Sequence, residues 1–268
     1  MSLWACNQLA KGWGGASSCS MGRRLPHMIR VLQTLAFVGL VLASAAVQGE
    51  EKKKGSEGRG WPPSPEGAET WHATTFVSSP VGFRVIDYWS KGDWMRANTL
   101  ISGHPITTLV RGDRYVVYDV LTGEGLSIRR SKRARKEDAK RERAFGNDLE
   151  EIIAAGGEKV EDTRLSGVDA TMWRLTDTRG RRTVWVRRRK PVIPLRVETF
   201  DRASSETVAV DYANWAAQIA IPDRFFEPPA GLELRKLDYE AFVKASQEGR
   251  AGPLPVLYPD LLHGGALR

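Results

Sequence analysis

Short apolar runs recur along the chain from residue 70 to residue 130, and each run ends at a turn signal. The clearest stretch extends from Phe83 to Asp119, where three runs rich in Val, Ile, Tyr, Trp and Thr are separated by Lys91-Gly92-Asp93, Ser102-Gly103-His104-Pro105 and Arg111-Gly112-Asp113. Gly beside Asp or Pro favours tight turns, and β-branched and aromatic residues favour strands. The pattern predicts a meander of antiparallel strands at residues 70–79, 82–90, 93–101, 105–110, 113–120 and 124–130.

A charged stretch interrupts this pattern. Residues 131–143 contain no β-branched residue and no apolar stripe, which predicts a solvated helix with Ser131 as its N-cap. Residues 148–155 predict a second short helix, capped by Asp148 and ended by two glycines. Strands resume at 158–166, 169–177, 181–189, 194–201 and 205–214, and a last helix is expected at 237–248.

This order predicts a mainly β fold with a few helices. Eleven or so short, regularly spaced strands favour a single curved antiparallel sheet that forms an unclosed half-barrel. Two or three short helices are expected to cover its open face as a helical lid, because an apolar face left in water is unfavourable. We expect the half-barrel domain at residues 69–236, and a C-terminal helix and Pro-rich tail at 237–268.

The N-terminal part carries the pattern of a secretory signal. Arg23, Arg24 and Arg30 precede an apolar run at 35–46, and Ala43-Ser44-Ala45 fits an A-x-A cleavage site. Residues 1–45 are therefore interpreted as an upstream extension plus signal peptide, with an uncleaved anchor as the alternative. Residues 46–68, rich in charge, Gly and Pro, predict a flexible linker. The expected location is the bacterial periplasm.

The predicted leader changes the meaning of the composition. The whole chain has 40 Lys and Arg against 32 Asp and Glu, but residues 1–45 hold four of the bases and none of the acids, which leaves a net charge of +4. This mild excess argues against nucleic acid as a partner. Both Cys6 and Cys19 lie upstream of the cleavage site, so the exported chain would need no disulfide and could not use a thiolate.

Candidate catalytic chemistry is sparse. None of the four histidines has a second metal ligand at a suitable spacing, and there is no H-E-x-x-H, G-x-S-x-G or P-loop motif. His72 is interpreted as a packing residue beside Trp71, and His104 as a turn residue. We therefore expect no metal, no cofactor and no enzymatic activity, with an enzyme as the third alternative.

Two groups of side chains remain as candidate binding residues. The first is aromatic, with an ordinary core as the alternative to a ligand-binding cavity wall; it comprises Tyr88, Trp89, Trp94, Trp173 and Trp185. The second is basic, with a solvated face as the alternative to a surface that docks headgroups or an acidic partner. It comprises Lys91, Arg96, Arg129, Arg130 and Arg133.

The order of motifs resembles the periplasmic carrier and sorting proteins of outer-membrane lipoproteins. The matching motifs are Tyr88-Trp89-Ser90-Lys91-Gly92-Asp93, the strand from Gly112 to Asp119, and Phe225-Phe226-Glu227-Pro228-Pro229-Ala230-Gly231. The resemblance covers residues 70–236. It departs from the family at residues 50–68, where an amphipathic helix is expected, and at Lys91-Gly92, where an Arg is expected.

The resemblance implies an unclosed β-barrel with a helical lid over a hydrophobic cavity for acyl chains. Together with the composition, it predicts a non-catalytic, monomeric periplasmic carrier that binds lipid or lipoprotein acyl chains and takes part in outer-membrane lipoprotein sorting. A membrane acceptor or an envelope protein would be its partner. The alternative is a protein–protein interaction or sensor module on the same scaffold, with a filled core in place of a cavity.

Overall fold

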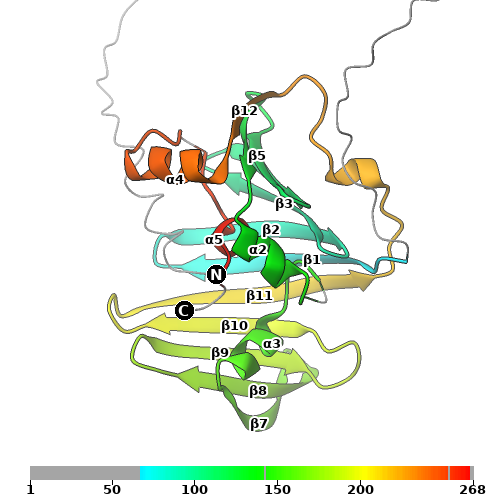
Figure 1. Cartoon of the computed structure of the whole chain (residues 1–268). Coiled ribbons are helices and arrows are strands. Elements are labelled where there is room, and N and C mark those ends of the chain that lie inside the picture. The colour runs from blue at the N-terminus through cyan, green and yellow to red at the C-terminus, as the bar shows by residue number, and fades with distance from the viewer. Residues whose placement is uncertain (1–66, 142, 253, 266–268) are drawn as a thin grey trace, which may run out of the picture. The chain divides into compact units, whose positions relative to one another are not determined.

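Twelve strands form one sheet in the computed structural model, which describes residues 67–265 except 142 and 253 (Figure 1). The predicted leader and almost all of the predicted linker lie outside the described residues. The strands are β1 (Thr70–Ser79), β2 (Gly82–Lys91), β3 (Trp94–Ile101), β4 (His104–Arg111), β5 (Arg114–Asp119), β6 (Glu124–Arg129), β7 (Glu158–Leu165), β8 (Val168–Thr176), β9 (Gly180–Arg187), β10 (Pro194–Asp201), β11 (Glu206–Ala217) and β12 (Glu233–Leu237).

The sheet consists of two antiparallel meanders that meet at β1. Strands β1 to β6 follow one another across the sheet, as do β7 to β11, and β1 pairs with both β2 and β11. The order β12-β6-β5-β4-β3-β2-β1-β11-β10-β9-β8-β7 leaves β12 and β7 as free edges, so the sheet is not closed into a barrel. The predicted fold class is confirmed; the pairing of β12 with β6 is parallel, in an otherwise antiparallel sheet.

Tight turns set the register of the first meander. The turn between β3 and β4 contains two residues, Ser102 and Gly103, with φ angles of 50° and 85°. Two successive positive φ angles are typical of the turn whose twist matches paired strands. Register then follows: Ile101 pairs with His104, and Thr99 with Ile106.

The helices are shorter than the sequence predicts. They are α2 (Lys132–Asp138), α3 (Asp148–Ala154), α4 (Tyr239–Gln247), α5 (Pro259–His263) and the 3-10 helix η1 (Asp223–Phe226). Ser131 is confirmed as the cap of α2, since its Oγ accepts from Ala134 N. The expected continuation of α2 to residue 143 is wrong. The helix ends at Asp138, whose carboxylate pairs with the buried Arg130, and Ala139 is the C-cap. Beyond it, the buried Arg143 donates to the carbonyls of Phe145 and Gly146.

The cap of α3 also differs from the prediction. Asn147, not Asp148, is the N-cap, and its side chain makes no capping bond. The Asp148 carboxylate instead accepts from Arg182 at 2.5 Å and from the Tyr212 hydroxyl at 2.9 Å. Leaving a buried cation unpaired costs more free energy than leaving a helix end uncapped where water can reach it, so the carboxylate pairs with Arg182.

One face of the sheet, which we term the inner face, carries the main core. Alternation along the strands places Ala73, Ile86, Tyr88 and Met95 on this face, with Tyr115 further along the sheet. The helices cover it: the same cluster includes residues of α3, α4 and α5, namely Ile152, Phe242, Leu261 and Leu262. The predicted helical cover over an open sheet is therefore present.

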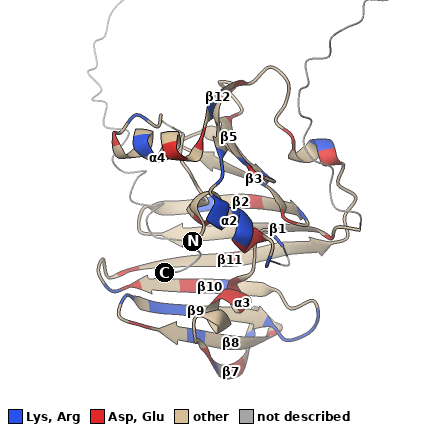
Figure 2. Cartoon of the chain, viewed as in Figure 1, with Lys and Arg blue, Asp and Glu red and all other residues tan. Residues whose placement is uncertain are grey.

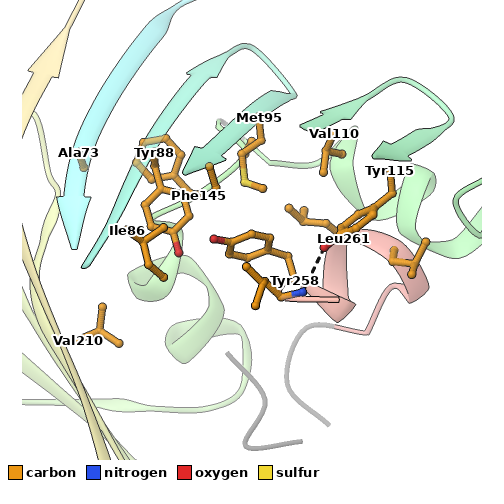
Figure 3. Packing of buried hydrophobic residues seen from close by; sticks show 14 of the residues in the cluster. Ala73, Ile86, Tyr88, Met95, Val110, Tyr115, Phe145, Val210, Tyr258 and Leu261 are labelled. Atoms are coloured by element: carbon orange, nitrogen blue, oxygen red, sulfur yellow. Dashed lines mark hydrogen bonds between the residues drawn. The ribbon is translucent and has the colours of Figure 1, made fainter. Parts of the chain in front are cut away.

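Residues 254–263, which we term the C-terminal segment, pack on this inner face. Tyr258 points toward Tyr88, with the ring centroids 5.7 Å apart (Figure 3). The N–H of Leu257 donates to the Tyr115 hydroxyl at 3.2 Å. Leu261 and Leu262 are buried. The tail thus belongs to the core of the sheet.

The opposite face has a smaller cover. Leu109, Val116 and Tyr118 form a second cluster there with Leu232 and Leu234. The 3-10 helix η1 packs beside this cluster against β3 and β4. Both faces of the β3–β5 region are therefore buried.

The alternation gives a direct test of which face carries the core. We expect Ile86→Ala to lower the free energy of unfolding by about 2–5 kcal/mol, because the side chain is 1% exposed and its removal leaves a cavity. The neighbouring Val85→Ala, which faces the other side and is 39% exposed, should change it by less than about 0.5 kcal/mol. Urea unfolding of both variants measures the contrast, and equal losses would contradict the assignment of faces.

Candidate binding groove

An open groove with a volume of about 1010 Å³ lies at one end of the first meander. The β1–β2, β3–β4 and β5–β6 turns all lie at this end, because alternate turns of an antiparallel meander share an end. The groove is lined by Val81, Phe83, Arg84, Leu100, Ile101, Ser102, His104, Ile106, Asp119, Thr122, Glu124, Gly125, Leu126, Glu233, Leu234, Arg235, Gly252, Leu254 and Pro255. Its walls thus come from strands of the first meander, their turns, β12 and the C-terminal segment.

Large apolar side chains surround the groove opening in exposed positions. Phe83 is 64% exposed and Leu100 62%, and Val81 is similarly open to solvent; all three line the groove. We term these three residues the rim. Clustered exposed apolar residues commonly mark a binding surface. The sequence could have indicated the rim, since these apolar residues lie in or next to hairpin turns, where polar residues are usual.

A polar pair lies within this apolar groove. His104 Nδ1 is 2.5 Å from Asp119 Oδ2, and Asp119 Oδ1 accepts from Leu121 N at 2.8 Å. Burial acts to raise the pKa of Asp119, but the bonds from Leu121, His104 and Thr122 outweigh it and lower that pKa below its ordinary value. The carboxylate is therefore charged at neutral pH and fixes the imidazole ring. His104 is the first residue of β4 and faces the groove, a role that its interpretation as a turn residue missed.

The pair is not a complete catalytic centre by itself. A carboxylate that orients a histidine needs a nucleophile or a metal to act on a substrate. The described residues contain no group of three or more His, Cys, Asp and Glu side chains placed to hold a metal ion. The pair is a fixed polar feature of the groove wall.

The C-terminal segment forms the inner end of the groove and contains a partly buried histidine. His263 Nδ1 lies 3.0 Å from the Tyr239 hydroxyl of α4, and the His263 ring stacks on Phe242. Burial lowers the pKa of His263 below its ordinary value of 6.5, although Asp260 acts in the opposite direction. The neutral ring is the form that fits the native structure.

The structure does not bring the five predicted wall residues together. Tyr88 and Trp173 lie on the inner face, where Tyr88 stacks on Phe145 at 5.1 Å and Trp173 is partly buried. Burial raises the pKa of Tyr88 to about 12, so its hydroxyl stays neutral. Trp185 pairs with Met172 and Arg196 on the other face. None of these three lines the groove.

The other two predicted wall residues pack against η1 on the opposite face. Trp89 meets the ring of Phe225 at 5.3 Å. Trp94 is buried, with Phe226 at one edge and the Arg111 guanidinium 3.7 Å from its ring centroid. These tryptophans therefore fix the segment that carries the Phe-Phe-Glu-Pro-Pro motif onto the sheet.

The predicted basic docking residues also have partners within the fold. Lys91 Nζ is 2.6 Å from Asp223, and Arg96 donates to the Phe225 carbonyl at 3.0 Å with its guanidinium over that ring. Both cations hold η1 in place. Sequence reasoning assigned them to a ligand because their partners lie more than a hundred residues away.

The three other basic candidates differ in burial. Arg129 lies near Asp113 and Asp238 at 3.4 and 3.6 Å, and Arg133 pairs with Glu137 at 2.9 Å; both cations are half-exposed. Arg130 is buried, where it pairs with Asp138 and donates to the carbonyls of Gly112 and Leu261 at 2.9 and 2.6 Å. Arg130 therefore serves structure, since all sides of its guanidinium fork are occupied.

The exposed charge of this region remains considerable. Figure 2 shows basic residues along much of α2, where Lys132, Arg133 and Arg135 are exposed.

Among the described residues no helix combines the length and apolar character needed to cross a membrane.

Comparisons with known proteins give only distant likenesses. No family model and no curated protein matches the sequence. Among solved structures, an uncharacterized conserved protein from Thermus thermophilus matches with a TM-score of 0.46 at 10% identity, over 62% of this chain and 90% of that one. MucB in the Pseudomonas aeruginosa MucA/MucB complex matches with a TM-score of 0.38 at 12% identity, over 60% of this chain and 56% of that one.

A third match is a putative outer membrane lipoprotein-sorting protein domain from Vibrio parahaemolyticus. Its TM-score is 0.31 at 13% identity, over 60% of this chain and 89% of that one. It is of the class that the sequence motifs resemble. All three TM-scores lie below 0.5.

The buried ion pair predicts a large loss when one partner is removed. We expect Asp138→Ala to cost about 3–5 kcal/mol, because Arg130 would be left buried without its carboxylate. Burial raises the pKa of Asp138, so the charge itself depends on Arg130. Arg133→Ala, which breaks a half-exposed pair on the same helix, should cost about 0–1 kcal/mol. Urea unfolding measures both, and a loss near 1 kcal/mol for Asp138→Ala would refute this role.

The lowered pKa of His263 predicts a pH dependence with a defined sign. Above about pH 7 the ring is neutral in both folded and unfolded chains, so it adds no dependence. As the pH falls below 6.5, the unfolded chain takes up a proton first, and stability is lost until the native ring also titrates. Unfolding at pH 7.5 and 5.5 should show a larger acid loss for the wild type than for His263→Gln. A difference between the two proteins that does not change with pH would contradict this.

Proposed function

We propose that this protein is a non-catalytic envelope carrier that binds the acyl chain of a lipid or lipoprotein in the groove. The observation that supports this most is the coincidence of the 1010 Å³ groove with the exposed apolar rim. Pockets for small ligands usually have volumes of about 300–1000 Å³, so the groove has room for a long chain. Each buried methylene contributes about 0.8 kcal/mol, which makes an acyl chain a sufficient ligand by itself.

The polar residues of the groove suit a headgroup. Arg84 and Arg235 line the groove together with the His104–Asp119 pair, Glu124 and Glu233. Two guanidinium groups bind a carboxylate or phosphate through charge-assisted hydrogen bonds, while the rim holds the chain. In this proposal the acyl chain lies among Phe83, Leu100 and Ile106, and its charged end faces the arginines.

The cellular setting is part of the same proposal. The expected leader would send the chain to the periplasm, where lipoproteins cross between membranes in transit to the outer membrane. The protein would act there as a monomer and exchange cargo with a membrane acceptor or an envelope protein. No covalent step is needed, because transfer requires only binding and release.

A protein–protein interaction module remains the second candidate. The observation that favours it is the C-terminal segment, since the inner face already accepts a stretch of polypeptide through Tyr88 and Tyr115. A partner peptide would then replace the acyl chain as the occupant. The following comparison of variants separates the two candidates.

A charge placed in the groove should abolish acyl binding and leave the fold intact. We expect Leu100→Glu to weaken binding of a fluorescent long-chain fatty acid by at least roughly tenfold, because a carboxylate would lie against the chain. Val168→Glu is the matched control: Val168 also lies exposed in a strand beside a turn, but away from the groove. Both variants should keep wild-type stability within about 0.5 kcal/mol.

The wild type supplies the decisive control. We would purify the protein from a periplasm and examine it by native mass spectrometry for an adduct that organic extraction removes. A lipid or acyl-peptide adduct, with the contrast between the two variants, supports the carrier. A mass without adduct together with no fatty-acid binding would rule the carrier out and favour the interaction module.

A further inference from the structure

The C-terminal segment divides a single apolar surface into two parts. Ile106 and Leu126 line the open groove, and the same side chains belong to the inner-face cluster with Tyr88, Met95 and Tyr115. Leu254 and Pro255 of the segment form the boundary, because they line the groove while Leu254 packs on the cluster. The groove ends where the segment begins.

The two halves of the segment are held in different ways. Residues 261–263 are anchored by α2 and the residues before it: Arg130 Nε donates to the Leu261 carbonyl at 2.6 Å, Ser131 N to the Leu262 carbonyl at 3.0 Å, and Ser131 Oγ to the His263 carbonyl at 2.8 Å. Asp260 adds an ion pair with Arg141 at 3.2 Å. These are directional bonds to backbone groups, which another molecule could not easily replace.

Residues 254–258 are held mainly by apolar contact. They belong to no strand or helix, and their backbone meets the sheet at the Tyr115 hydroxyl, which accepts from Leu257 N at 3.2 Å and also interacts with the backbone of Tyr258. Leu254, Val256, Leu257 and Tyr258 otherwise pack on the cluster through their side chains. Apolar burial is non-directional, so a second apolar chain of similar size would recover most of its free energy.

We propose that the binding site continues beneath residues 254–258, and that these residues are a plug which a long acyl chain displaces. This inference rests on the proposed function, since the chain enters through the same groove. A short chain fills the open groove and stops at Leu254. A longer chain pushes residues 254–258 from the inner face and takes their place beside Tyr88 and Met95, while α5 stays anchored.

The geometry before the plug allows such a movement. Gly252, with a φ angle of 105°, lies two residues before the segment and also lines the groove. A residue with that backbone freedom can absorb a change in chain direction. The plug is thus a loop between α4 and α5, and it joins α5 at the N-cap Tyr258, whose carbonyl accepts from Leu261 N at 3.1 Å. Movement of the plug therefore pivots at Tyr258, while the bonds to residues 261–263 hold the rest of α5.

Hydrogen exchange with ligands of two lengths tests the plug. We expect hexadecanoic acid to speed amide exchange at residues 254–258 and to leave residues 261–263 unchanged. Octanoic acid should bind without altering either stretch, because it does not reach the plug. Faster exchange with both acids, or slower exchange at 254–258 with the longer acid, would overturn the inference.

A substitution in the plug should change the affinity for the longer fatty acid. Leu257→Ala removes apolar contact from the plug and should tighten hexadecanoic acid binding by on the order of tenfold, because less free energy is needed for displacement. Octanoic acid affinity should stay within about twofold. Leu175→Ala is the control: it deletes the same atoms from β8, at the other end of the core, and should change neither affinity.

The outcomes distinguish this inference from the proposed function. Binding of both acids with no difference between the variants and no change in exchange would overturn the plug and keep the groove. Binding of neither acid to the wild type would overturn both. Leu175→Ala controls for general destabilisation, because it removes apolar contact from a partly buried position elsewhere in the core.

Discussion

The need to cover one apolar face governs this structure. A sheet of twelve strands that does not close has an inner face rich in Ile, Val, Met and Tyr side chains, and water is an unfavourable neighbour for it. The chain covers this face with short helices and its own C-terminal segment. Where that cover ends, the groove begins. The candidate groove therefore joins the uncovered part of the inner surface, around Ile106 and Leu126, to the exposed strand ends that carry Phe83 and Leu100.

Buried arginines connect this cover to the sheet. Arg182 on β9 binds Asp148 and Glu151 of α3, Arg130 binds the end of α2 and the carbonyl of Leu261, and Arg143 lies over Trp71 and Trp215. Burial acts to lower the pKa of Arg182, but its two carboxylates outweigh this and raise it above its ordinary value. These buried arginines thus fix where each covering segment packs on the sheet, although the segments and the strands are distant in sequence.

Strand positions could be predicted from the sequence because alternation and turn residues are local signals. The eleven expected strands occur within about three residues of their predicted ends. Three elements were missed: β12, η1 and α5 are each five residues or shorter, and their positions depend on distant partners such as β6 and Trp94. Local pattern does not contain that information.

The site residues show where sequence reasoning was limited. Tyr88 and Trp89 are adjacent in one strand, so alternation alone required them to face opposite sides. The same parity places His104, Ile106 and Asp119 on one face, since Ile106 pairs with Asp119, and this could have indicated the His104–Asp119 pair. Parity does not show which face of the sheet is covered, because some covering residues follow far later in the chain; Tyr258, for example, packs on Tyr88 from 170 residues away (258 − 88).

The free β7 edge of the sheet has a consequence for aggregation at high protein concentration. Strand β7 offers unpaired backbone groups on one side, which is the template by which sheets of separate molecules merge into aggregates. Its sequence, Glu-Lys-Val-Glu-Asp-Thr-Arg-Leu, places five charged side chains in eight positions, most of them exposed. A second strand that approached would have to strip water from these charges. The same sheet can therefore expose an apolar rim at one end of the first meander while its β7 edge resists self-association.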